Sequence, residues 1–185
     1  SSLNKIVVTN CPIGSHGLRI LTPAINKLHT ITQVTVKGCG ISDDGVNFLT
    51  SILRASVAHM DQLYWNSTLR MSDPIDGSLD SSTSGAVMNE ETSHVFSSGL
   101  VVLDVSDNEL TSGALQTLSR QLKNNHWLLA LDLSGNKIDE AGLVSLANTL
   151  SAGENSALGT VLVRGNPGFC KVACDKLQEV TDAAS

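Results

Sequence analysis

The chain has 185 residues, of which 41% are hydrophobic and only 3% aromatic, and its formal net charge is −6. A chain of this length fits one domain or slightly more, and its hydrophobic content is ample for a core of Leu, Val and Ile. The negative charge argues against nucleic acid as a partner, because neutralising phosphates needs a basic surface. No signal peptide is recognisable and no apolar run approaches the roughly 18 residues of a membrane span, so we expect no membrane partner.

A strand-like segment followed by a helix-like segment recurs along the chain. The copy at 128–138 reads LLALDLSGNKI, with apolar residues at its first, fourth and sixth positions. The five copies begin at Leu3, Ile31, Leu100, Leu128 and Leu158. These starts are 28, 69, 28 and 30 residues apart, and the second spacing is one period of 28 plus 41 extra residues. A strand and a helix in roughly 20–29 residues are typical of leucine-rich repeats.

Behind the strand-like segments, apolar residues at spacings of three and four predict helices with one buried face. These stripes are Leu18/Leu21/Ile25/Leu28, Val46/Leu49/Leu53, Leu115/Leu118/Leu122 and Leu143/Leu146/Leu150. Because no unit can bury its own apolar face, we predict an α/β leucine-rich repeat solenoid of the ribonuclease-inhibitor-like class. A parallel sheet should line its concave side and helices its convex side. Residues 1–185 should form one such domain, a fragment of a longer protein because the first strand has no cap.

The ninth position of each unit holds Cys or Asn, in chain order Cys11, Cys39, Asn108, Asn136 and Asn166. A buried Asn amide can satisfy backbone groups that the bend after a strand leaves without partners. Cysteine would fill the same slot with weaker hydrogen bonding. We interpret Cys11 and Cys39 as structural, and Cys170 and Cys174 as core residues of the last helix. Four cysteines without a close-spaced pattern indicate a reducing compartment.

The extra residues fall between the second helix and the third strand, at roughly 56–98, and form a long insertion between repeats two and three. We predict that 56–70 continues the helix and that the Ser-, Asp- and Gly-rich segment 71–98 is a loop. Such insertions frequently carry binding function, although a tolerated excursion is the alternative. Tyr64 and Trp65 favour binding, because the core does not require aromatic residues there.

Outward-facing strand positions predict a mixed charged strip on the concave side. They are Lys5, Val7 and Thr9; Gln33, Thr35 and Lys37; Val102, Asp104 and Ser106; Ala130, Asp132 and Ser134; Thr160, Leu162 and Arg164. We expect Asp104 and Asp132 side by side, flanked by Lys37 and Arg164. This strip suits a protein partner better than a small substrate, which needs a closed pocket. The alternative is a strand face that is merely solvated.

Nothing in the sequence predicts catalysis. The histidines are scattered and pair with no Ser or Cys in a recognisable nucleophile setting; they are His16, His29, His59, His94 and His126. Neither a phosphate-cradling glycine loop nor metal-ligand spacing is present. We therefore predict a protein that is not an enzyme and that uses no cofactor or metal.

Five stretches in a fixed order carry a resemblance to a known family. They are NCPIGSHGL (10–18), VKGCGISDDG (36–45), YWNSTLR (64–70), HWLLALDLSGNKIDEAG (126–142) and VRGNPGF (163–169). Together they resemble the leucine-rich repeat domain of the centrosomal protein of 78 kDa family, and Trp65-x-x-x-Leu69-Arg70 is the most specific part. The acidic, Ser-rich second half of the insertion departs from the more basic interruption of animal members, which puts contacts made there in doubt.

The resemblance implies a cytoplasmic, cytoskeletal protein of the centrosome, the centriole or the flagellar basal body that supports cilium formation. It implies an adaptor that binds centriolar or basal-body proteins and recruits a ubiquitin ligase assembly. Leu69 and Arg70 thereby join Tyr64 and Trp65 as candidates for partner binding. Two other functions stay open: a ribonuclease-inhibitor-like regulator of a small GTPase, by fold analogy, and a structural component of the ciliary cytoskeleton.

Overall fold

The computed structural model describes residues 3–70, 99–123, 125–151, 157–170 and 173–178. These residues form one parallel sheet whose strand order equals the chain order. The strands are β1 (Lys5–Thr9), β2 (Gln33–Lys37), β3 (Val102–Asp104), β4 (Ala130–Asp132) and β5 (Thr160–Leu162). The helices are α1 (Gly14–Ile25), α2 (Val46–Arg70), α4 (Ser112–Leu122) and α5 (Glu140–Ser151), with a 3₁₀ turn η1 (Asp43–Gly45) before α2. Residues 173–178 are also helical.

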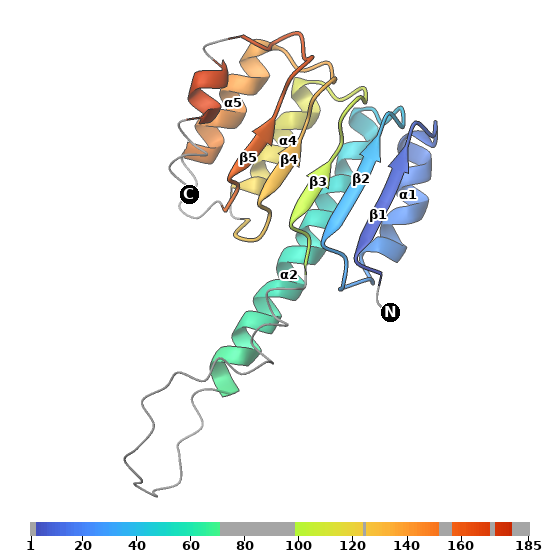
Figure 1. Ribbon diagram of the computed structural model, residues 1–185, viewed down its shortest axis with the longest axis vertical. Helices are drawn as coiled ribbons and strands as arrows, with labels where there is room; N and C mark the ends of the chain where they lie inside the picture. Colours follow the sequence, from blue (N-terminus) through green and yellow to red (C-terminus); the bar gives the residue numbers. More distant parts are fainter. Residues whose placement is uncertain (1–2, 71–98, 124, 152–156, 171–172, 179–185) are drawn as a thin grey trace, which may run out of the picture.

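The units stack in two layers, as predicted. Strands lie side by side in one layer, and the helices cover one face of the sheet (Figure 1). Side chains that alternate inward, such as Val34, Leu103 and Leu131, are at most 1% exposed and form one continuous core with the helices. Because helices cover only one face, the other face of the sheet stays open. Below, unit one to unit five denote the repeats that begin at residues 3, 31, 100, 128 and 158.

The helical stripes are buried as expected except in the first stripe, where Leu21 is half-buried and Leu28 is exposed. Leu28 is 38% exposed, because α1 ends at Ile25 and the chain turns before reaching it. Two helices begin at side chains that cap them. The hydroxyl of Thr111 accepts a hydrogen bond from the Gly113 N–H at the start of α4. The carboxylate of Asp139, the residue before α5, accepts one from the Gly142 N–H in the first turn of that helix. Such caps satisfy N–H groups that the first helical turn leaves free.

A residue with left-handed backbone follows each strand within three residues of its end. The φ angle is positive, from 52° to 72°, at Asn10, Gly38, Asp107, Gly135 and Gly165. These residues directly precede the ninth position, so the chain bends at the same point in every unit. Glycine suits this conformation, and Asn and Asp are the side chains that tolerate it best.

The ninth-position side chains bind neighbouring units together. Asn136 donates to the C=O groups of Leu133 in its own unit at 2.9 Å and Val105 in the preceding unit at 3.0 Å. Its Oδ1 accepts the Leu110 N–H at 3.1 Å. Asn108 and Asn166 make equivalent bonds, so the predicted role of these amides is confirmed.

The cysteines at the same position differ from one another. Cys39 is fully buried, and its thiol donates to the C=O groups of Val8 at 3.4 Å and Lys37 at 3.3 Å. Cys11 is exposed, so the expectation that it fills a buried slot is wrong. Within the described residues no unit lies on its outer side. At the other end, Cys170 packs partly against the core, and Cys174 is half-buried beside the buried Ala173 and Leu177.

Helix α2 is longer than its neighbours. It spans 25 residues, and its last turns extend beyond the starting ends of the strands (Figure 1). Met60 is buried at 2% exposure against Gly99, where the chain returns to the stack. The predicted continuation of the helix through 56–70 is confirmed, whereas the predicted loop 71–98 lies outside the described residues. No helix in the described part is long and apolar enough to cross a membrane.

Candidate functional site: the open sheet face and the end of α2

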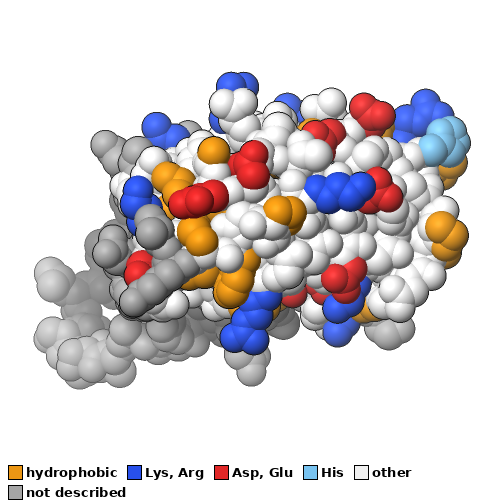
Figure 2. All heavy atoms as spheres, turned by 90° about the horizontal axis from the view of Figure 1, so that it is seen from above, with side chains coloured by type: hydrophobic (Ala, Val, Ile, Leu, Met, Phe, Trp, Pro, Cys, Tyr) orange, Lys and Arg blue, Asp and Glu red, His pale blue; other side chains and the backbone are white. Residues whose placement is uncertain are grey.

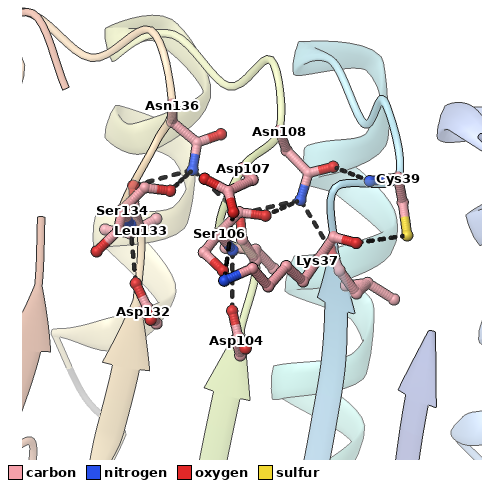
Figure 3. Close-up of polar contacts among 12 residues, drawn as sticks. Lys37, Cys39, Asp104, Ser106, Asp107, Asn108, Asp132, Leu133, Ser134 and Asn136 are labelled. Carbon is pink, nitrogen blue, oxygen red and sulfur yellow. Dashed lines mark hydrogen bonds and ion pairs between the residues drawn. The ribbon is translucent and has the colours of Figure 1, made fainter. Parts of the chain in front are cut away.

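The open face of the sheet carries two carboxylates at its centre. Asp104 of β3 and Asp132 of β4 are direct partners in the register, as predicted, and both are half-buried. Figure 3 shows their side chains on neighbouring strands. Like charges in directly opposite positions repel one another. A cationic group that docks between them would remove this repulsion, so the pair can accept a positively charged ligand group.

Backbone hydrogen bonds fix the orientation of both carboxylates. Asp104 Oδ1 accepts the Ser106 N–H at 3.0 Å, and Asp132 Oδ1 accepts the Ser134 N–H at 2.8 Å. Each aspartate therefore supports the bend at the end of its own strand. Because these bonds are made through Oδ1, Oδ2 of each carboxylate can receive a donor from outside.

A lysine and a third aspartate lie at the carboxyl end of the strands. The Lys37 ammonium pairs with the Asp107 carboxylate at 3.3 Å. The hydrogen bond and charge of Asp107 raise the pKa of Lys37 above its usual value, and the more distant charges of Asp104 and Asp132 add to this effect. Charged groups of both signs are interspersed over the surface seen in Figure 2. The two central aspartates make the middle of the sheet face acidic, and the Lys37–Asp107 pair adds charges of both signs at the carboxyl end of the strands.

Lys37 and Arg164, the predicted flanks of the aspartate pair, are not its direct partners in the register. Thr35 pairs with Asp104 and Leu162 pairs with Asp132 in the register. Lys37 lies two residues beyond Thr35 at the end of β2, and Arg164 lies two residues beyond the end of β5. Lys37 extends toward Asp107, as Figure 3 shows. Arg164 is exposed at the last strand. The site thus has an apolar neighbour, Leu162 at 45% exposure, that the prediction did not place beside Asp132.

Two residues predicted to face outward are buried. Thr35 is 7% exposed, because the Gln33 side chain lies against it and donates to its hydroxyl at 3.4 Å. Ser106 is 1% exposed, and among the described residues its hydroxyl has no hydrogen-bond partner. It lies two residues beyond the end of β3, where the chain bends.

A second exposed surface lies at the end of α2. Tyr64 is 57% exposed and Trp65 is 64% exposed. The Tyr64 ring meets Trp127 at 6.5 Å between centroids, and the Trp127 indole N–H donates to Asp61 at 3.0 Å. These contacts join α2 to the turn before β4. We call Asp61, Tyr64, Trp65 and Trp127 the aromatic surface.

The structure does not bring the two groups of candidates together. The aromatic surface lies near the starting ends of the strands, whereas Lys37 and Arg164 lie at or beyond their carboxyl ends (Figure 1). The side chains of Leu69 and Arg70 lie outside the described residues. Sequence reasoning missed Asp61 and Trp127, because a contact between residues 66 apart leaves no local pattern.

Two histidines outside these surfaces pack against each other. His29 and His59 stack at 4.2 Å between ring centroids beside a small, mainly apolar cavity of about 30 Å³ between α1 and α2. Burial, and then the charge of His29, lower the pKa of His59, which favours the neutral form. In the described part of the chain, no three His, Cys, Asp or Glu side chains gather in a way that could hold a metal ion.

Known proteins match this chain in part of its sequence and in its fold. A leucine-rich repeat family model matches residues 124–147, which include β4 and much of α5. The human centrosomal protein of 78 kDa is 30% identical over 74 residues, which is 40% of this chain and 11% of that protein. The chain thus matches only a small part of that protein's length.

Two solved structures resemble the fold over almost the whole chain. The tropomodulin C-terminal domain of Caenorhabditis elegans superposes with a TM-score of 0.65 at 14% identity, covering 98% of this chain and 84% of that one. The structure of leiomodin-1 actin-binding site 2 superposes with a TM-score of 0.64 at 13% identity, covering 98% of this chain and 80% of that one. At such identities the likeness shows the fold alone.

Proposed function

We infer that the chain is a non-catalytic leucine-rich repeat scaffold of the ribonuclease-inhibitor-like class that holds a protein partner on its open sheet face. The observation that carries this proposal is the pair Asp104 and Asp132, two neighbouring carboxylates fixed in orientation on a rigid sheet. Rigid elements position a binding group at little entropic cost on association. The partner should present Arg or Lys, and Arg fits best because its planar fork can reach two carboxylate oxygens.

The apolar surroundings of the pair favour a macromolecular partner. Leu162 and Val7 lie in the same cross-strand row as the aspartates and are 45% and 52% exposed. A basic side chain flanked by apolar ones would match this row. The row crosses the sheet from edge to edge, a shape that suits an extended segment of a protein.

The aromatic surface is proposed as a second contact. Exposed Tyr and Trp are enriched where proteins bind one another, because they contribute large areas with few rotatable bonds. The bond from Trp127 to Asp61 holds this end of α2 against the stack. Two contacts at separate places on one rigid body would let a partner bind more tightly than through either alone.

We propose that the partner is a cytoskeletal protein of the centriole or basal body and that the chain supports cilium formation there. The partial match to the human centrosomal protein of 78 kDa and the resemblance in the repeat stretches support this location. Recruitment of a ubiquitin ligase assembly is a further proposal, which rests on the resemblance alone. Its direct test is co-purification of ligase subunits with the chain.

A fluorescent fusion in ciliated cells tests the proposal. The chain should concentrate at basal bodies, and Asp104→Arg with Asp132→Arg should disperse it. The matched control reverses two exposed acids off the sheet, Asp44→Arg with Asp175→Arg, and changes the net charge equally. Equal dispersal of both variants would show a general charge effect, and basal-body signal in the Asp104 and Asp132 variant would contradict the proposed site. Circular dichroism must confirm that both variants fold.

Actin is the second candidate partner. The leiomodin-1 structure is that of an actin-binding site, and it shares this fold. Sedimentation of the purified chain with actin filaments distinguishes the two candidates. Pelleting that is lost in the Asp104 and Asp132 variant but kept in the control would move the proposal from a centriolar protein to actin.

A further inference from the structure

Cys11 and Cys39 occupy equivalent positions in two adjacent units. Thr9 and Lys37 are partners in the register of β1 and β2, and the Asn10 N–H donates to the Lys37 C=O at 2.8 Å. On the far side, the Gly14 N–H donates to the Cys39 C=O at 2.9 Å. These bonds bracket the two cysteines, so their Cα atoms lie about one strand spacing apart, roughly 4.8 Å. Disulfides join Cα atoms that are about 4.4–6.8 Å apart.

The Cys39 thiol points toward unit one. It donates to the Val8 C=O at 3.4 Å, across the boundary between the two units. Burial raises the pKa of this thiol, the backbone N–H of Cys11 opposes that rise, and the Cys11 thiol adds to it. These influences arise because Cys11 lies against the buried sulfur. Cys11 itself is exposed, so its side chain can rotate about χ1 and can be reached by a reagent.

We propose that Cys11 and Cys39 form a reversible disulfide that fastens unit one to unit two under oxidising conditions. Both are free thiols in this structure, which corresponds to the reduced form. The inference does not depend on the proposed function. It assigns to this pair a redox chemistry that the Asn residues of units three to five cannot perform.

A small disulfide such as oxidised glutathione can drive the reaction in two exchange steps. The exposed Cys11 thiolate attacks one sulfur of oxidised glutathione, the bond between the two glutathione sulfurs breaks, and one glutathione thiolate leaves. Cys39 then loses its proton to water, and its sulfur attacks Cys11 Sγ of the mixed disulfide. The bond to the second glutathione breaks and that thiolate leaves. Two protein thiols are oxidised and one glutathione disulfide is reduced to two thiols.

The bond would reinforce the least covered end of the described stack. In β1, Ile6 and Val8 are only half-buried, and Val7 is 52% exposed. The cross-link closes a loop of 28 residues, the difference between positions 39 and 11, and such closure restricts the unfolded chain. Cys39 gives up its single S–H, which lies within reach of the Val8 and Lys37 C=O groups, and the S–H group is a weak donor.

Treatment of the purified chain with oxidised glutathione tests the proposal. Cys170→Ser with Cys174→Ser removes the other thiols, and if that variant does not fold, peptide mapping of the unaltered chain gives the same answer. We expect an intact mass lower by two hydrogens, a cross-linked pair of peptides containing Cys11 and Cys39, and a melting temperature higher by about 5 °C. Dithiothreitol should reverse all three changes. A glutathionyl group that persists on Cys11 beside a Cys39 that can still be alkylated would overturn the proposal.

Two matched variants separate the steps. Cys39→Asn carries the residue that units three to five have at this position, so it should fold, accumulate the mixed disulfide on Cys11, and gain no thermal stability on oxidation. Cys11→Asn, made together with Cys170→Ser and Cys174→Ser, should leave only the buried Cys39 thiol, and its reaction with oxidised glutathione should slow at least about tenfold. If Cys11→Asn reacts as fast as the unaltered chain, Cys39 is the thiol that reacts first and the proposed sequence is wrong.

Discussion

Unit one and units two to four of the stack make different hydrogen bonds at the same turn. In unit one, the Ile13 N–H donates to the Cys11 C=O at 2.7 Å. The equivalent N–H groups of Ile41, Leu110 and Ile138 donate instead to the Asn side chain of the following unit, each at 3.1 Å. The difference arises because Cys39 has no amide oxygen to offer. At this turn, a side-chain amide therefore joins each pair of units from unit two to unit five, whereas a thiol stands in its place between units one and two.

This difference indicates where the stack opens first. Local unfolding begins where few buried contacts and weak hydrogen bonds hold a segment. Unit one has a neighbour on only one side within the described chain, and a thiol replaces the amide at that boundary. The central aspartates lie in units three and four, which Asn136 ties together. The proposed binding site thus lies on two units that a buried amide ties together.

Asn136→Ala should have the largest effect on this arrangement. It removes the acceptor of the buried Leu110 N–H and the donor to two buried C=O groups, and we expect a loss of about 4 kcal/mol in the free energy of unfolding. Cys39→Ala is the matched change at the other end, where we expect about 1 kcal/mol. Urea unfolding measures both, and equal losses would contradict the difference between the two ends.

Gly135→Ala should have the next largest effect. Gly135 has a φ of +65°, and a Cβ there would lie against Asp107 Oδ1. We expect a loss of about 2 kcal/mol from left-handed backbone and this clash together. In Gly159→Ala, the control, the new methyl group meets nothing within 4 Å. Adding Asp107→Gly to Gly135→Ala should recover part of the loss. If a double-mutant cycle of these two substitutions shows no coupling, the Asp107 side chain does not lie over Gly135.

Cys39→Asn should reduce the difference between the two ends. The new amide would offer an acceptor to Ile13 N–H and a stronger donor to the Val8 C=O, and we expect a gain of about 1 kcal/mol. Hydrogen exchange measured by NMR should show slower exchange of the Ile13 amide. If that amide exchanges at an unchanged rate, the missing acceptor is not what weakens unit one.

Asp104→Asn with Asp132→Asn should have the smallest effect on stability. Asn keeps an oxygen for the Ser106 and Ser134 N–H groups, while the repulsion between the two charges disappears. We expect a gain of about 0.5 kcal/mol at low salt that shrinks as salt is added. A loss of stability would show that the charged carboxylates hold their turns more strongly than they repel each other.

Repetition explains how much of the fold could be predicted. The pattern in LLALDLSGNKI specifies a strand, a bend and an amide, and its recurrence fixes which segments become neighbours. The pairing of Asp104 with Asp132 follows from the same register. The direction of Lys37 toward Asp107 does not follow, because it depends on a left-handed residue in another unit. The burial of Thr35 by Gln33 is likewise a contact between particular side chains rather than a property of the repeat.

The aromatic surface, too, could be predicted from the sequence only in part. The sequence indicates that Tyr64 and Trp65 are not needed in the core, and both are indeed exposed. It gives no sign that Trp127 reaches Asp61, because the contact depends on how far α2 extends beside the turn before β4.

Site-specific photo-cross-linking in ciliated cells tests the central claim most directly. A photo-reactive amino acid at Leu162, on the open sheet face, should capture a centriolar or basal-body protein, and Asp104→Asn with Asp132→Asn should abolish that product. The same amino acid at Ala141, an exposed position of α5 on the helical side, should capture none. Capture from position 141 but not from position 162 would show that the helices face the partner and would contradict the account.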